Sequence, residues 1–215
     1  MNVINGLANV LQNNLKARDG SPAKETLQRE EIRNFAVTMK HNAIQLHHMT
    51  LMLYDSSDTG LADTSRYERK DKVLCNELVH TCITDILSRG AVQEIHFETQ
   101  LPDDLCITTN RLFLTRTINE LLQNATKYSD GQHITVSASR TENAVRFIIE
   151  DVGPGLPKYS EDLLFVPFTK VDDLSVGLGL GLPLCKRHMT GLGGNIIHDT
   201  TYERGCRFII ELPLS

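Results

Sequence analysis

Seven positions between residues 32 and 53 restrict the fold of the first third of this chain more than any other feature. They are separated by alternating steps of three and four residues, and only Asn42 among them is polar. Such spacing places all seven side chains on one stripe of a helix, as in a coiled coil. An earlier helical pattern over residues 4–11 and turn residues at 19–22 precede this stripe, so we predict an antiparallel helical hairpin over residues 1–70. The seven positions are Ile32, Phe35, Met39, Asn42, Leu46, Met49 and Leu53.

A hairpin with one apolar stripe on each helix has too little partner surface to bury both stripes by itself. A second copy of the chain would bury them in a four-helix bundle. The alternative is that the hairpin packs on the rest of the same chain. We favour the homodimer, because two-fold dimers are the commonest closed assemblies.

From residue 71 onward the pattern changes to alternating helices and strands. This order predicts an α+β fold, a two-layer sandwich in which one mixed sheet carries helices on one face. We accordingly expect two domains, residues 1–70 and residues 71–215. Helical periodicity covers residues 73–87, 112–128 and 180–189, and strand patterns cover residues 95–98, 105–107, 134–138, 145–150, 195–198 and 207–212.

The composition, with 40% hydrophobic and 23% charged residues, is that of an ordinary soluble globular protein. The net charge of −5 argues against a broad surface for nucleic acid or anionic membranes. No apolar run reaches the ~18–20 residues needed to cross a bilayer, and the residues after Met1 do not resemble a signal peptide. The five cysteines lack Cys-x-x-Cys spacing, which favours reduced, buried thiols of a cytoplasmic protein.

Two polar motifs point to a ligand. Glu120 and Asn124 are four residues apart on a predicted helix and Lys127 lies one turn further, so one face combines a carboxylate, an amide and an ammonium group. This set suits a hydrated Mg²⁺ with phosphates, although alone it also fits a solvated face. Asp151 ends a predicted strand and is followed by two glycines, at 153 and 155. These let the backbone approach a planar ligand while the carboxylate accepts a hydrogen bond, although alone the pattern also fits a turn.

Two further motifs follow in the chain. Phe165 and Phe168 indicate either core positions or a hinged loop, in which case Lys170 would face the ligand. Three alternating glycines at 177, 179 and 181 precede a predicted helix and would expose consecutive N–H groups near its positive end, as a phosphate cradle does. The loop lacks the Gly-Lys-Ser/Thr of a Walker A motif and the preceding strand of a dinucleotide fingerprint.

Taken together and in this order, the four motifs resemble the N, G1, F and G2 boxes of the GHKL ATP-binding fold in its sensor histidine kinase branch. The resemblance covers residues 71–215 and includes the ending Gly-Cys-Arg-Phe-Ile-Ile-Glu-Leu-Pro at 205–213. It implies a two-layer α/β sandwich of the GHKL ATPase type, preceded by a dimerisation hairpin. It also implies a protein-histidine kinase of a two-component system, with ATP and Mg²⁺ as cofactors.

The resemblance assigns roles to the matching positions. Asn124 corresponds to the asparagine that coordinates Mg²⁺, and Lys127 and Tyr128 correspond to residues that contact the phosphates and the ring. Asp151 corresponds to the aspartate that accepts a hydrogen bond from the adenine amino group. The glycines match the tight backbone beside the base (Gly153 and Gly155) and the mobile ATP lid (Gly177, Gly179 and Gly181).

Glu120 stands where the family usually has Asn or Glu. In the branches that hydrolyse ATP, a glutamate there activates water, whereas a histidine kinase has an imidazole nucleophile and needs that role less. Two positions depart from the family: Leu178 replaces the usual Thr or Ser of the lid, and Cys206 replaces the usual Ser or Thr after Gly205. Both departures are expected to weaken nucleotide contacts without abolishing the site.

A histidine kinase also needs a phosphoacceptor. His41 resembles one only superficially, because Asn42 stands at the usual acidic position and Leu46 at the usual proline. Residues 1–11 instead resemble the stretch after the phosphoacceptor motif, and residues 47–55 resemble the end of the second hairpin helix. We therefore expect a fragment of a larger kinase that lacks the phosphoacceptor histidine and does not autophosphorylate.

The implied reaction is transfer of the ATP γ-phosphoryl group to a histidine and then to the receiver domain of a response regulator. If the parent protein is anchored in a membrane, this part is expected on the cytoplasmic side. Two alternatives stay open. One is an ATPase that hydrolyses ATP with Glu120 as the base. The other is a degenerate, non-enzymatic module that only dimerises and docks a partner.

Overall fold

The computed structural model describes residues 32–37, 39, 43, 46, 50, 67–88, 94–129, 133–156, 163–169 and 179–214. The chain divides into two compact units, Met1–Leu51 and Met52–Ser215. In the first unit residues 32–37 are helical, and the stripe residues Ile32, Met39 and Leu46 are exposed. The first predicted helix, the turn at 19–22 and His41 lie outside the described residues, so the hairpin, its dimer and the boundary near residue 70 stay predictions.

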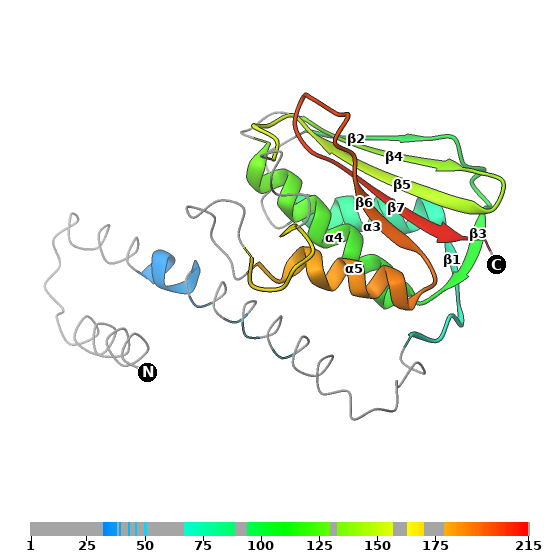
Figure 1. Ribbon diagram of the computed structural model, residues 1–215, viewed down its shortest axis with the longest axis horizontal. Helices are drawn as coiled ribbons and strands as arrows, with labels where there is room; N and C mark the ends of the chain where they lie inside the picture. Colours follow the sequence, from blue (N-terminus) through cyan, green and yellow to red (C-terminus); the bar gives the residue numbers. More distant parts are fainter. Residues whose placement is uncertain are drawn as a thin grey trace, which may run out of the picture. The chain divides into compact units, whose positions relative to one another are not determined.

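The second unit is a two-layer sandwich. Its main sheet has the strand order β2-β4-β5-β7-β6, in which β2 and β4 are parallel and the other neighbours are antiparallel. Helices α3, α4 and α5 lie on one face of this sheet, with α4 between the other two (Figure 1). The elements are β1 (Asp71–Leu74), α3 (Cys75–Ser88), β2 (Ile95–Thr99), β3 (Cys106–Thr109), α4 (Arg111–Tyr128), β4 (Ile134–Arg140), β5 (Ala144–Asp151), α5 (Gly181–Gly191), β6 (Asn195–His198) and β7 (Arg207–Pro213).

The predicted α+β sandwich is confirmed, but the prediction of one mixed sheet is wrong in one place. The strand predicted at residues 105–107 leaves the main sheet and pairs as β3 with β1 in a separate two-stranded sheet. The first two residues of the helix predicted at 73–87 belong to β1. The sequence of β1 gives little sign of a strand, because only Val73 of its four residues is buried.

Helix α4 carries the polar motif of residues 120–127 toward the end of β5, where the Tyr128 carbonyl lies close to Gly153. Asn110 caps its first turn by accepting a hydrogen bond from the Phe113 N–H at 3.3 Å. One stripe of the helix is buried against α3, α5 and the sheet, through Leu114, Ile118, Leu121, Leu122 and Ala125. This stripe fixes the rotation of α4 about its axis. The polar residues near the carboxyl end of α4 therefore lie on a defined side of the helix.

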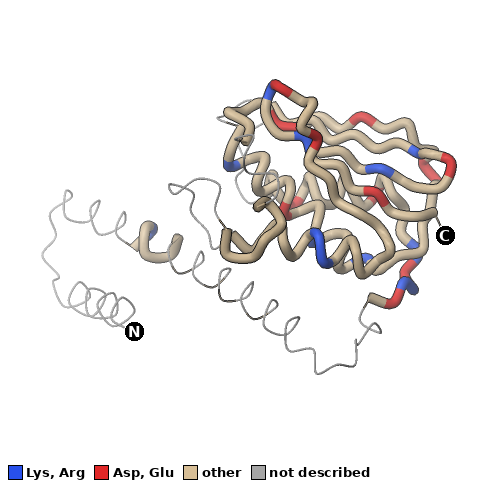
Figure 2. The backbone as a smooth tube through the Cα atoms, in the orientation of Figure 1, with Lys and Arg blue, Asp and Glu red and all other residues tan. Residues whose placement is uncertain are grey.

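All five cysteines lie among the described residues. All five cysteines are free thiols, as predicted, and all except Cys106 are buried. No helix in the described part of the chain combines the length and the apolar character that crossing a bilayer requires. Acidic and basic positions are interspersed along the strands and loops of the second unit (Figure 2).

Candidate functional site

Asp151, the last residue of β5, forms one wall of the candidate site. Only 5% of this residue is exposed. Its Oδ1 accepts a hydrogen bond from the Cys206 N–H at 3.0 Å, and its own N–H donates to the Cys206 carbonyl at 2.9 Å. Burial raises the pKa of the carboxyl group, and the hydrogen bond from Cys206 opposes this shift. The backbone of Cys206, the residue before β7, therefore holds the carboxyl group in place.

Glycines let three segments meet at this wall. A Cβ atom at Gly153 would lie 2.4 Å from the carbonyl oxygen of Tyr128, at the end of α4. A Cβ atom at Gly205 would lie 2.2 Å from the carbonyl oxygen of Asp151. Gly155 has a φ of +69°, which favours glycine. We call Asp151, Gly153, Gly205 and Cys206 the base wall, after the role in base binding that the resemblance predicts for Asp151 and Gly153. Gly153 and Gly155 lie close to backbone of other segments, and their approach to a planar ligand stays a prediction.

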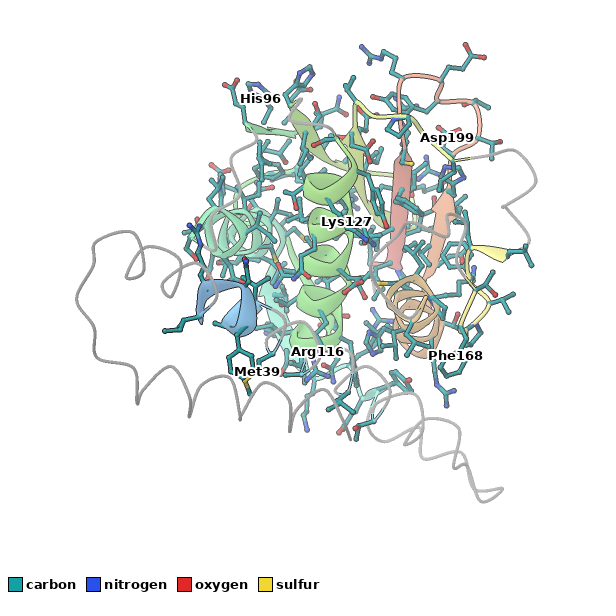
Figure 3. All side chains as sticks on the ribbon, turned by 90° about the vertical axis from the view of Figure 1, so that its left-hand side faces the viewer. Met39, His96, Arg116, Lys127, Phe168 and Asp199 are labelled. Carbon is teal, nitrogen blue, oxygen red and sulfur yellow. The ribbon has the colours of Figure 1, made fainter. Side chains whose placement is uncertain are left out.

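The polar face of α4 lies beside the base wall. Asn124 is half-buried, and Lys127 and Tyr128 are exposed. The Lys127 Nζ donates to the Tyr128 hydroxyl at 2.7 Å and lies 4.5 Å from the centre of its ring. Figure 3 looks onto this end of the molecule, with Lys127 on α4 and Asp199 in the loop before β7.

Glu120 lies deeper, against the first turn of α5. A Cβ atom at Gly181 would lie 1.8 Å from its Oε1. Burial of the carboxyl group raises its pKa, and the charge of Lys127 opposes this shift. A carboxylate at a helix N-terminus is favourable because the helix dipole is positive there. We call Glu120, Asn124, Lys127 and Gly181 the phosphate face, after the binding of Mg²⁺ and phosphates that the sequence predicts for this set.

The segment that contains Phe165 and Phe168 contacts the glycine-rich segment before α5. Gly179 has a φ of +67°, and a Cβ atom there would lie 2.2 Å from the Thr169 carbonyl oxygen. The Phe168 N–H donates to the Gly179 carbonyl at 3.1 Å. Phe165 packs against the core, whereas Phe168 is 63% exposed (Figure 3), so the two aromatic residues have different environments. Lys170 and Gly177 lie outside the described residues, and their roles stay predictions.

The structure thus brings together most of the site residues suggested by the motifs. Tyr128 of α4 meets Gly153 after β5, and Glu120 of α4 meets Gly181 of α5. Sequence reasoning missed the contact between Gly205 and Asp151, although the glycine belongs to the ending at 205–213. The oxygen donors near the carboxyl end of α4, a carboxylate and an amide, suit Mg²⁺ that is also bound by phosphates and water.

Comparisons with known proteins identify the family of this chain. Residues 109–215 match the family described as histidine kinase-, DNA gyrase B-, and HSP90-like ATPase. The chain is 32% identical over 164 residues to the alginate biosynthesis sensor protein KinB of Pseudomonas aeruginosa, which covers 72% of this chain and 27% of KinB. The chain therefore spans about a quarter of the length of that relative.

Solved structures show the same fold. The catalytic domain of histidine kinase ThkA is 26% identical with a TM-score of 0.59, covering 67% of this chain and 97% of that domain. Histidine kinase AdeS of Acinetobacter baumannii has a TM-score of 0.64 and covers 99% of this chain and 95% of its own; at 21% identity it shows a likeness of fold alone. The motifs, the geometry around Asp151 and these relatives show that this chain belongs to the GHKL sensor histidine kinases, with the ATPase family domain over residues 109–215.

Proposed function

We propose that this chain is the ATP-binding catalytic part of a two-component sensor histidine kinase. It binds ATP with Mg²⁺, and the parent kinase transfers the γ-phosphoryl group to a histidine and then to the receiver domain of a response regulator. The observation that carries this proposal is the base wall. It is a buried carboxylate held by the Cys206 backbone and lined by glycines, directly beside a polar helix face.

Base recognition falls to Asp151. Its carboxylate accepts a hydrogen bond from the adenine amino group, which selects adenine over a base that presents a carbonyl at that position. Gly153 and Gly155 keep side chains out of the space that the planar base needs. The Tyr128 ring, exposed at the end of α4, packs beside the nucleotide.

Phosphate binding falls to side chains of α4 and to the lid. Asn124 supplies an oxygen atom for Mg²⁺, and the ion when bound would neutralise part of the phosphate charge. The Lys127 ammonium group contacts the phosphates, and its exposure leaves it able to turn toward them. Lys170 and the glycines Gly177, Gly179 and Gly181 complete the cover over the phosphates.

His41 is not proposed as the phosphoacceptor, because Asn42 and Leu46 stand where the family motif has an acidic residue and a proline. The exposed stripe residues Ile32, Met39 and Leu46 support a homodimer through the hairpin. In the parent protein this part functions on the cytoplasmic side.

A second candidate, hydrolysis of ATP, is favoured by one observation. Glu120 is a carboxyl group with a raised pKa between α4 and the start of α5, which suits a general base that activates water. Steady phosphate release that Glu120→Gln abolishes would establish hydrolysis. Release below the limit of detection in the wild type would leave phosphoryl transfer as the function.

Calorimetric titration of an ATP analogue with Mg²⁺ into the wild type and Asp151→Asn tests the proposal. We expect the wild type to bind and the variant to lose at least about a hundredfold in affinity, because the amide presents a donor to the adenine amino group. Equal affinities would contradict the role of Asp151. The absence of any binding by the wild type would favour a module that only docks a partner.

A further inference from the structure

Arg207, the first residue of β7, joins three segments next to the base wall. It is paired with Glu150 across β5 and β7, and its Nε donates to the Glu150 carboxylate. Its Nη1 donates to Asp199 Oδ2 at 3.0 Å, and its guanidinium group lies 4.3 Å from the centre of the Tyr202 ring. One cation therefore connects the end of β5 to the loop between β6 and β7.

Asp199 also shapes that loop. Its Oδ1 accepts hydrogen bonds from the Thr201 N–H at 3.0 Å and the Thr201 hydroxyl at 2.6 Å. Its own N–H donates to the Arg207 carbonyl at 2.8 Å. Hydrogen bonds from Thr201 and Arg207 lower the pKa of Asp199, so its charge is retained beside Arg207. Both ends of the loop are thus fixed at Arg207.

The same loop supplies the contacts that hold the base wall. The Arg204 carbonyl accepts a hydrogen bond from the Gly153 N–H at 3.2 Å. Gly205 packs on the backbone of Asp151, and the Cys206 N–H donates to Asp151 Oδ1. Residues 204–206 therefore stand between the ion pairs of Arg207 and the carboxylate of Asp151.

We propose that Arg207 is a positioning residue that sets the selectivity for adenine by holding residues 204–206 against Asp151. The inference rests on the proposed function, in which Asp151 binds the adenine amino group. Adenine presents a donor where guanine presents a carbonyl acceptor, so a carboxylate fixed in one orientation binds adenine in preference to guanine. If residues 204–206 were free to move, the Asp151 carboxyl group could rotate, and the selectivity for adenine over guanine would fall.

The chain offers a matched control on the same two strands. Arg146 is paired with Glu211 across β5 and β7 and donates to its carboxylate. This pair also joins an arginine to a glutamate on the same strands, but Arg146 precedes Asp151 by five residues. Replacing Arg146 removes a surface ion pair with Glu211 and leaves the contacts of residues 204–206 in place.

The experiment compares the wild type, Arg207→Gln, Arg207→Lys and Arg146→Gln, each titrated calorimetrically with ATP and with GTP in the presence of Mg²⁺. We expect Arg207→Gln to weaken ATP binding about tenfold, as partial loss of a charge-assisted hydrogen bond would. Binding of GTP should change less, so the ratio of the two affinities falls. Arg207→Lys should lie between the wild type and Arg207→Gln, because an ammonium group cannot bridge two carboxylates as a planar guanidinium does.

Hydrogen exchange of the Cys206 amide provides a second readout without nucleotide. We expect faster exchange in Arg207→Gln than in Arg146→Gln at equal thermal stability. An unchanged affinity ratio in Arg207→Gln, or an equal fall in Arg146→Gln, would overturn the inference. A wild type that binds no ATP would contradict the proposed function and the role in base selection together, while the exchange rates would still show whether Arg207 holds the loop.

Discussion

The base wall and the phosphate face lie side by side but are built differently. At the base wall, Asp151 is held by hydrogen bonds to the backbone of Cys206, and the neighbouring glycines contact carbonyl oxygens. At the phosphate face, Lys127 contacts the side chain of Tyr128, and Gly181 contacts the side chain of Glu120. One half of the site is therefore fixed by sheet register, and the other half depends on side chains that can turn.

This difference matches what the proposed function requires each half to recognise. A planar base is discriminated by donor and acceptor positions, which require a rigid frame. Phosphates with Mg²⁺ are recognised mainly by charge, which tolerates movement of long side chains. Substitutions should consequently lower ATP affinity most where they displace backbone, and less where a side chain can move aside.

The largest effect is expected from Gly205→Ala. The added methyl group would meet the carbonyl oxygen of Asp151 at 2.2 Å and its Oδ1 at 2.7 Å, and backbone cannot move aside as a side chain can. We expect ATP affinity to fall at least about a hundredfold, as for a clash at a special backbone position. Gly191→Ala is the control, because the atoms nearest to its methyl group would be those of the Tyr67 side chain and Gly191 is the last residue of α5, away from the base wall. Similar affinities in the two variants would show that the base wall is not rigid.

Lys127→Ala should have the next largest effect and should act on the phosphates alone. We expect about a tenfold loss of affinity for ATP and no change for adenosine, because an ammonium group contributes through charge-assisted hydrogen bonds. Titrations with both ligands at two salt concentrations measure this difference. Lys127→Arg should retain most of the affinity. A comparable loss for adenosine would place Lys127 at the base.

Gly181→Ala should be milder than Gly205→Ala, although its methyl group would come as close as 1.8 Å to Glu120 Oε1. The atom it meets is the end of a side chain, which can rotate away. We expect Gly181→Ala to lower ATP affinity about threefold in the wild type and by less when Glu120 is already replaced by alanine, because the contact that the methyl group would disturb is then absent and contacting residues are coupled. A double-mutant cycle measures the coupling, and strictly additive losses would show that the contact carries none of the effect.

The smallest effect concerns stability and pH in the absence of nucleotide. Burial raises the pKa of Glu120 above its ordinary value of 4.5, so the folded chain favours the protonated carboxyl group. The stability contributed by this group is fully present below pH 4.5 and is lost as the pH rises through the folded-state pKa. Glu120→Gln should therefore raise the free energy of unfolding at pH 7, and the difference should shrink toward pH 4.5.

Urea unfolding at several pH values checks this expectation. The exposed Glu142, in the turn before β5, provides the control Glu142→Gln, which makes the same change of side chain at a solvent-exposed position. A Glu120→Gln variant less stable than the wild type at pH 7 would show that the ionised carboxylate stabilises α5 more than its burial costs.

Local patterns predicted the parts of the site that lie within one element. Helical spacing placed Glu120, Asn124 and Lys127 on one face of α4, and the end of an apolar strand placed Asp151 before its glycines. The separate sheet of β1 and β3 was not predicted, because a four-residue strand with one buried side chain carries too little periodicity.

Sequence by itself determined the order of helices and strands after β1, the motifs and the family, because periodicity and turn chemistry act over a few neighbouring residues. Only the tertiary structure decided that Gly205 packs on Asp151, that Glu120 lies against Gly181 and that Arg207 joins Glu150 to Asp199. These contacts join residues far apart in the chain, through the register of β5 with β7 and the packing of α4 on α5. Neither the register nor the helix packing is encoded in any short stretch of sequence.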